Sequence, residues 1–211
     1  MEKLFEEMAQ VLIAGNQDEV VKKTQEALDK NAAARDVMDK GLLAGMEVVG
    51  RRFKAGDMFI PEVLRCAKCM HAAMDLIKPL LSEGESAGAG TYLIGTVEGD
   101  LHDIGKNLVS MLLQGSGFDV VDLGTNITPQ QFVDAVKEHN PKIVGLSALL
   151  TTTMPKMEET IKALEEAGIR DNVKVMCGGA PVTQNFVEKI GADAYGANAA
   201  TASELAKELA S

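Results

Sequence analysis

The sequence has no apolar run near the roughly 20 residues that a membrane-spanning helix requires. Residues 1–10 carry mainly acidic charge, where a secretory signal would carry basic charge. Basic residues are also few, with 21 Lys and Arg against 31 Asp and Glu and a net charge of −10. Such a surface repels phosphate backbones and anionic lipids. We therefore expect a cytoplasmic protein that binds neither nucleic acid nor membranes.

Cysteine and aromatic residues are scarce. The 3 cysteines are an odd number, which together with the acidic start favours reduced thiols over a disulfide framework. Cys66, Cys69 and His71 have a zinc-like spacing, but a structural zinc site needs about four ligands and no second pair follows. We expect no zinc here, and we expect His71 and His139 to be surface or structural residues.

The length of 211 residues suggests two domains. Residues 1–83 show apolar side chains at helical spacing, broken at Gly15 and Gly56, and predict four helices with short connections. The buried stripes are expected at Leu4, Met8, Val11 and Leu12; at Val20, Val21, Thr24 and Leu28; at Val37, Leu42, Met46 and Val49; and at Leu64, Met70, Met74 and Ile77. Such a pattern is typical of a small helical bundle. Residues 84–90 are small and polar and form the predicted linker.

From residue 91 to 211 short apolar runs alternate with helical patterns. Strands are expected at 92–97, 119–123, 143–147, 174–177 and 192–195, and helices at 105–114, 129–139, 155–167, 183–190 and 200–210. This order predicts an α/β domain with a flavodoxin-like, Rossmann-type, doubly wound five-stranded parallel sheet. Such sheets bind ligands beyond the carboxyl ends of their strands. The loops after the first, third and fourth strands are therefore the candidate site.

The loop after the first strand, 95–105, is glycine-rich and places Asp100 two residues before His102. A carboxylate against one imidazole nitrogen fixes the tautomer and leaves the other nitrogen free as a base or metal ligand. The residues alone equally allow His102 to bond within the loop while Asp100 or Asp103 caps the helix that opens at Gly105.

The other two loops offer hydroxyls and bare backbone. Ser147, Thr151, Thr152 and Thr153 precede Pro155, and we expect one of these hydroxyls to cap the next helix. The pair at 178–179 is glycine, which lets a bulky group approach the backbone closely, although a tight turn would also explain it.

Together these pieces read Asp-x-His-x-x-Gly, Ser-x-Leu and Gly-Gly, on the three loops that the strand pattern marks. In this order and spacing they resemble the cobalamin-binding module of methionine synthase and of corrinoid methyltransferase proteins. The resemblance covers nearly the whole chain, because the methyl-transferring branch of that family also carries an N-terminal four-helix cap.

The resemblance implies that His102 is the lower axial ligand of cobalt, in place of the cofactor's own dimethylbenzimidazole. Asp100 would accept the other imidazole N–H, and Thr153, where the family has serine, would complete a proton relay. Phe59, Val63 and Met70 would be candidates for covering the upper, methyl-bearing face, although each of them could equally belong to the core of the helical bundle. The cofactor-binding residues implied in addition to His102 are Gly105, Ser147, Leu149, Thr151, Gly178 and Gly179.

The function implied is a non-catalytic corrinoid subunit that carries a methyl group on cobalt. A substrate:corrinoid methyltransferase for methylamine, betaine, methanol or a methoxylated aromatic would load it. A methyl-corrinoid:acceptor methyltransferase would unload it onto a thiol or a tetrahydrofolate-type acceptor, and a reductive activase would keep the cobalt reduced. Two alternatives stay open: a cobalamin sensor or storage module without turnover, and a receiver-like signalling domain.

Overall fold

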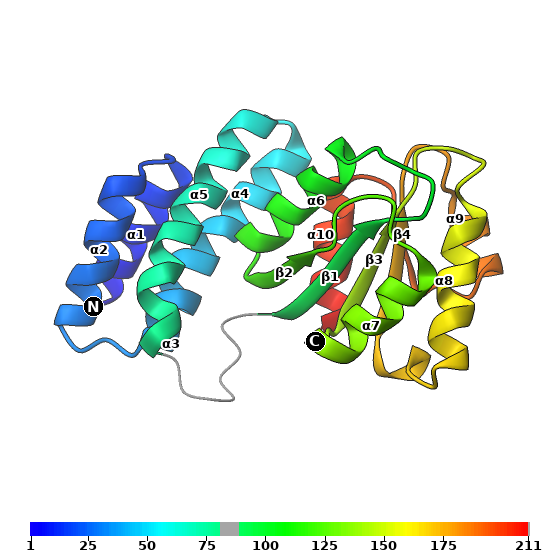
Figure 1. Cartoon of the computed structure of the whole chain (residues 1–211). Helices are drawn as coiled ribbons and strands as arrows, with labels where there is room; N and C mark the ends of the chain where they lie inside the picture. The colour runs from blue at the N-terminus through cyan, green and yellow to red at the C-terminus, as the bar shows by residue number, and fades with distance from the viewer. Residues whose placement is uncertain (81–88, 211) are drawn as a thin grey trace. The chain divides into compact units, whose positions relative to one another are not determined.

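The computed structural model describes residues 1–80 and 89–210. The chain divides into two compact units, a helical one and one that begins at Ala89 and contains the sheet (Figure 1). The predicted linker at 84–90 lies outside the described residues except for its last two, and Gly90 already belongs to the first strand. Among the described helices, none is long and apolar enough to cross a membrane.

The helical unit follows the predicted order of helices, with one irregularity in the third. Val37–Leu43 winds as a π-helix between two α-helical segments. Gly41 lies in this stretch, and a Cβ there would stand 2.5 Å from the Met8 sulfur, so the missing side chain makes room for α1. The elements are α1 (Glu2–Ile13), α2 (Gln17–Asp29), α3 (Ala34–Asp36), η1 (Val37–Leu43), α4 (Ala44–Ala55), α5 (Ile60–Ile77) and η2 (Lys78–Leu80).

The residues predicted to be buried in α1, η1 and α4 are buried, except for Val11, which is half-buried. The stripe predicted for α2 is wrong in part, because Val21 and Leu28 are only half-buried and Ala27 is fully buried. Two of its predicted residues, Val20 and Thr24, are buried as expected. The buried face of helix α2 is therefore formed by Val20, Thr24 and Ala27, and Val21 and Leu28 lie at its margin.

In α5 the zinc-like pair is part of the buried face. Cys66 and Cys69 are both buried, and burial raises the pKa of the Cys66 thiol to about 11. Within residues 1–80 and 89–210 no group of three or more His, Cys, Asp or Glu side chains could hold a metal ion. Of the three cap residues named above, Val63 and Met70 are buried, whereas Phe59 is 69% exposed.

The second unit is a parallel sheet of five strands in the order β2-β1-β3-β4-β5. This confirms the predicted fold class, and the strand boundaries differ from the prediction by at most two residues. The strands are β1 (Gly90–Thr96), β2 (Phe118–Asp122), β3 (Ile143–Ser147), β4 (Lys174–Gly178) and β5 (Ala194–Gly196); the helices are α6 (Ile104–Gly115), α7 (Pro129–His139), α8 (Pro155–Glu166), η3 (Arg170–Asn172), α9 (Gln184–Lys189) and α10 (Ala199–Ala210).

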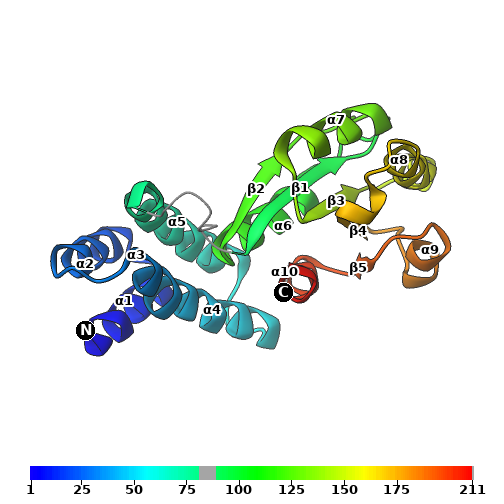
Figure 2. The same ribbon diagram turned by 90° about the horizontal axis from the view of Figure 1, so that it is seen from below.

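Helices cover both faces of this sheet (Figure 2). One face carries Leu93, Val144 and Val175 and packs under α7, α8 and α9. The other face carries Tyr92 and Ile94 and packs under α6 and α10. Because side chains alternate along a strand, the residues that follow on the second face at the carboxyl ends are Thr96, Ser147 and Gly178. Their loops form the edge where the predicted site lies.

Candidate functional site

Asp100 is the centre of the polar contacts at this edge. Its side chain is fully buried, and its Oδ1 accepts hydrogen bonds from the backbone N–H of His102 at 3.1 Å and from His102 Nδ1 at 2.7 Å. Its Oδ2 accepts from the backbone N–H groups of Leu149 at 2.7 Å and Leu150 at 3.2 Å, and from Thr153 Oγ1 at 2.7 Å. The loop after β1 is thereby joined to the loop after β3.

These donors decide the charge of Asp100 and the tautomer of His102. Burial alone would raise the pKa of the Asp100 carboxyl, but the hydrogen bonds from His102, Thr153 and Leu149 outweigh it and hold the pKa well below its usual range. An ionised carboxylate only accepts, so Nδ1 of His102 must carry the proton. The other nitrogen, Nε2, keeps its lone pair and has no hydrogen-bond partner among the described residues. With 51% of its side chain exposed, the imidazole is available to an external ligand.

Local capping does not account for these residues. The N-cap of α8 is Met154 with no side-chain cap, so the prediction that a hydroxyl from 147–153 caps this helix is wrong. The Thr153 hydroxyl instead donates to the Asp100 carboxylate at 2.7 Å, a charge-assisted hydrogen bond. The methyl group that distinguishes Thr153 from serine leaves this contact intact. The Asp103 carboxylate, just before α6, accepts a hydrogen bond from the Asn107 side chain. Asp100 instead connects the loop after β1 to the loop after β3.

Two residues that sequence reasoning missed hold the loop in place. Asn126 donates its backbone N–H to the Asp100 carbonyl at 3.0 Å, and its side chain accepts from the Gly99 N–H at 2.7 Å. The Thr96 hydroxyl donates to the His102 carbonyl at 3.0 Å. Asn126 lies in the loop after β2, which carries none of the predicted site residues, and its φ of 58° is a conformation that asparagine tolerates.

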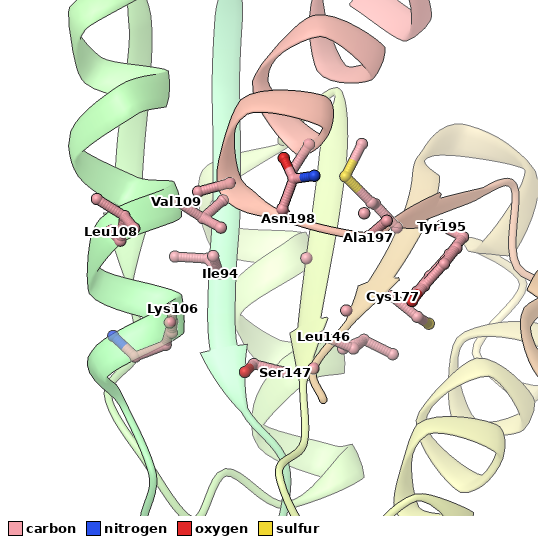
Figure 3. Close-up of a pocket in the computed structure, with 18 of the residues that line it drawn as sticks. Ile94, Lys106, Leu108, Val109, Leu146, Ser147, Cys177, Tyr195, Ala197 and Asn198 are labelled. Carbon is pink, nitrogen blue, oxygen red and sulfur yellow. The ribbon is translucent and has the colours of Figure 1, made fainter. Parts of the chain in front are cut away.

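A cavity of about 250 Å³ lies between the sheet and helices α6 and α10 (Figure 3). Four of the predicted binding residues line it, namely Gly105, Ser147, Gly178 and Gly179. The other three, His102, Leu149 and Thr151, are not among its lining residues and are exposed on the loops after β1 and β3. Sequence reasoning missed the contributions of β1, α6, β5 and the segment before α10. The missed residues include Tyr92, Ile94, Lys106, Val109, Tyr195 and Asn198.

The strand register explains why there is space at this place. Gly145 pairs with Met176, and Ser147 pairs with Gly178, which in turn pairs with Gly196. All of these positions face α6 and α10, so three neighbouring strands present small residues at the same level of the sheet. A face that would normally be filled by branched side chains is left open there.

Large apolar side chains are exposed near His102 in the sequence and on the loop that binds Asp100. Leu101 is 72% and Ile104 is 86% exposed, and Leu149 and Leu150 are 43% and 42% exposed. Apolar side chains exposed in this way, next to His102 in the sequence and on the loop that binds Asp100, indicate a ligand surface at this edge of the sheet. The ligand they suit has an apolar face and a part that enters the sheet domain.

Comparison with protein families identifies this class of protein. Residues 90–205 match the model of a B12 binding domain, and residues 4–78 match a second model that is also described as a B12 binding domain. Because the first match covers more than half of the chain, the chain belongs to the family of B12-binding proteins. Its cofactor is a cobalamin or a related corrinoid, as predicted.

Individual relatives match this chain over nearly its full length. A dimethylamine corrinoid protein from Methanosarcina acetivorans is 45% identical over 99% of this chain and 98% of its own length. The methanol:cobalamin methyltransferase complex from Methanosarcina barkeri matches with a TM-score of 0.86 at 34% identity, covering 99% of this chain and 80% of that chain. A cobalamin-binding protein from Desulfitobacterium hafniense matches with a TM-score of 0.78 at 36% identity, and the match covers 97% of this chain and 98% of that chain. These relatives support the corrinoid interpretation over a receiver-like signalling domain.

The absence of a side chain at Gly105, which lines the cavity, indicates that the cavity fits such a cofactor. It is the second residue of α6, and a Cβ added there would have no heavy atom within 4 Å among the described residues. Nothing within the fold requires glycine, which is a poor helix former. A group that enters the cavity from outside would require it.

We therefore expect Gly105→Ala to stabilise the cofactor-free protein by about 0.5 kcal/mol, because alanine favours the helix. The same substitution should weaken cobalamin binding by at least about tenfold, since the added methyl occupies space at the cavity wall. Urea unfolding and a spectroscopic titration with cobalamin measure the two effects separately. Unchanged affinity would show that the cofactor does not approach α6.

Proposed function

We propose that this chain is the corrinoid methyl carrier of a multi-component methyltransferase system, with His102 as the lower ligand of cobalt. The observation that carries the proposal is the pairing of His102 Nδ1 with buried Asp100, which leaves Nε2 without a hydrogen-bond partner among the described residues. The helix that follows His102 contributes Gly105 and Lys106 to the wall of the cavity, which is where the nucleotide tail would enter. The relatives named as corrinoid proteins of methylamine systems support it.

Different residues would contact different parts of the cofactor. His102 would bind the cobalt, while Ser147, Gly178 and Gly179 would border the nucleotide tail in the cavity. Leu149, on the exposed loop after β3, would lie against the corrin edge. When bound, the corrinoid supplies a cobalt centre that in its reduced state can take up a methyl group and give it away.

Asp100 and Thr153 would control the proton on His102. The carboxylate of Asp100 accepts from Nδ1, so Nδ1 keeps its proton and Nε2 is the nitrogen that would bind the metal. Asp100 itself stays ionised because its hydrogen bonds hold its pKa low, so the proton would remain on the imidazole. The Thr153 hydroxyl, 2.7 Å from Asp100 Oδ2, keeps the carboxylate oriented.

The partners we propose are two methyltransferases and a reductive activase. A solved relative is a methanol:cobalamin methyltransferase complex, and others are named for dimethylamine and trimethylamine. We therefore propose methylamines as the first donors to test, with methanol, betaine and methoxylated aromatics next. The acceptor enzyme would act on a thiol or a tetrahydrofolate-type compound.

Methyl transfer from a defined donor tests this proposal. The protein is loaded with hydroxocobalamin, reduced with titanium(III) citrate, and mixed with a dimethylamine, trimethylamine or methanol methyltransferase and its substrate. If the protein is a carrier, the absorption spectrum of the reduced cobalamin changes to that of methylcobalamin, and the demethylated product forms in a stoichiometric amount. A control without reductant gives neither result. Tight histidine ligation with no transfer from any donor would favour a sensor or storage module, and absence of cobalamin binding would refute both functions.

A further inference from the structure

Tyr92 places a hydroxyl deep in the cavity. Its side chain is 1% exposed and lines the cavity on the same face of β1 as Ile94 and Thr96, at the end farther from the carboxyl edge. A Cβ on Gly145 would lie 2.7 Å from the Tyr92 hydroxyl oxygen. The absence of a side chain on Gly145 is thus what allows the hydroxyl to lie across the middle of the sheet.

The fold gives this hydroxyl a poor partner. It donates to the thioether sulfur of Met176 at 3.5 Å, and a thioether is a weak acceptor. The aromatic ring has a full role of its own, in an edge-to-face contact with Phe118 at a centroid distance of 6.0 Å. Phenylalanine would serve that role without the cost of burying a poorly paired hydroxyl. Burial also raises the pKa of Tyr92, so the group stays neutral and can both donate and accept.

We propose that the Tyr92 hydroxyl selects the corrinoid by its lower base, and favours a base whose leading edge carries a hydrogen-bonding group. The inference rests on the proposed function, in which the nucleotide tail is displaced from cobalt by His102. In that tail the base is the terminal part, so the base reaches farthest into the cavity. Tyr92 would then be a specificity-determining residue for the cofactor.

The residues around Tyr92 are apolar, so the lower bases would differ in whether they can pair with its hydroxyl. Ile94, Val109 and Met176 line the cavity, belong to the same apolar cluster as Tyr92, and offer no strong hydrogen bond. A dimethylbenzimidazole would present methyl groups and leave the Tyr92 hydroxyl with its thioether. A hydroxybenzimidazole or an adenine would present a hydroxyl or an amino group that pairs with it. A site built around such a group rejects the ligand that lacks it, because its own polar atom is then left poorly paired.

The test measures dissociation constants of three corrinoids that differ in the lower base: dimethylbenzimidazole, 5-hydroxybenzimidazole and adenine. We expect the wild-type protein to bind at least one of the two polar-base corrinoids about tenfold more tightly than the dimethylbenzimidazole form. Tyr92→Phe should abolish this preference. The cofactor-free variant should unfold at the same or a higher temperature, because the hydroxyl has no structural role.

Tyr195→Phe is the matched control, because it removes the hydroxyl of the chain's other tyrosine, whose half-buried side chain packs on the opposite face of the sheet, with the core under α7, α8 and α9. This variant should keep the wild-type preference. A preference of the wild-type protein for dimethylbenzimidazole, or a preference that survives in Tyr92→Phe, would overturn the inference while leaving the carrier function intact. If none of the three corrinoids binds, the proposed function itself fails.

Discussion

Replacing Asp100 by asparagine is expected to lower the free energy of unfolding of the cofactor-free protein by about 3 kcal/mol. Asp100 is fully buried and accepts five hydrogen bonds, and an amide can accept at only one of its two ends. The variant must therefore place an NH2 group against N–H donors. Urea unfolding measures the loss. Asp103→Asn, the same change at a half-buried position, should cost less than about 1 kcal/mol.

The same substitution should also change the tautomer of His102. If the new asparagine side chain turned its NH2 group toward the loop after β3, it would meet the two backbone donors of Leu149 and Leu150. Turned toward His102, it meets one backbone donor and can donate to Nδ1. The second arrangement leaves fewer donors unpaired and puts the proton of the imidazole on Nε2. We expect the variant to bind corrinoid with little or no histidine ligation, visible in its absorption spectrum.

The pH dependence follows from the direction of the Asp100 shift. The pKa in the folded chain lies below the ordinary value of about 3.9, so the folded chain binds this proton less readily than the unfolded chain. The stability that the carboxylate contributes is complete above about pH 5 and is lost as the pH falls below about 4. The difference between wild type and Asp100→Asn should shrink in the same window. A difference that stays constant down to about pH 3 would contradict this account.

Gly179→Ala is expected to destabilise the protein by more than about 3 kcal/mol and to damage the site. A Cβ there would stand 1.8 Å from the Ala148 carbonyl oxygen, and the φ of 135° is one that other residues rarely adopt. Relief of the clash must move Ala148, whose neighbour Leu149 donates to Asp100. We therefore expect weaker corrinoid binding as well as a lower midpoint of urea unfolding.

Gly168→Ala separates conformational strain from the clash. Gly168 also has a positive φ, of 68°, but a Cβ there meets no described atom within 4 Å. It should cost only about 1 kcal/mol and leave corrinoid binding unchanged. If Gly179→Ala behaves like Gly168→Ala, the close approach of the two loops does not matter for the site.

The sequence predicted the sheet and the location of the site for physical reasons that are local. Short apolar runs between helical patterns define buried parallel strands, and carboxyl ends of such strands form the binding edge. The residues alone did not decide between a capping and a binding role for Asp100 and His102. The resemblance to corrinoid proteins favoured the binding role, and the contact of Asp100 with the loop after β3 is what excludes simple capping.

The errors concern contacts between residues that are distant in the sequence. The residues alone placed Thr153 in a set of capping hydroxyls, because a local pattern does not reveal a buried carboxylate 53 residues earlier in the chain, and only the resemblance paired Thr153 with Asp100. The role of Asn126 depends on where the loop after β2 meets the loop after β1. Tyr92 looked like an ordinary strand residue, and only the register that places Gly145 beside it reveals the hydroxyl in the cavity.

The identity of the nitrogen below the cobalt tests the central claim most directly. The protein is produced with ¹⁵N-labelled histidine, loaded with unlabelled cobalamin, reduced to cobalt(II) and examined by electron paramagnetic resonance. We predict that the axial nitrogen splits each cobalt line into a doublet, and that the doublet is absent from His102→Ala but present in His71→Ala and His139→Ala. A triplet in the labelled wild-type protein would show that dimethylbenzimidazole remains the ligand, and would contradict the role assigned to His102.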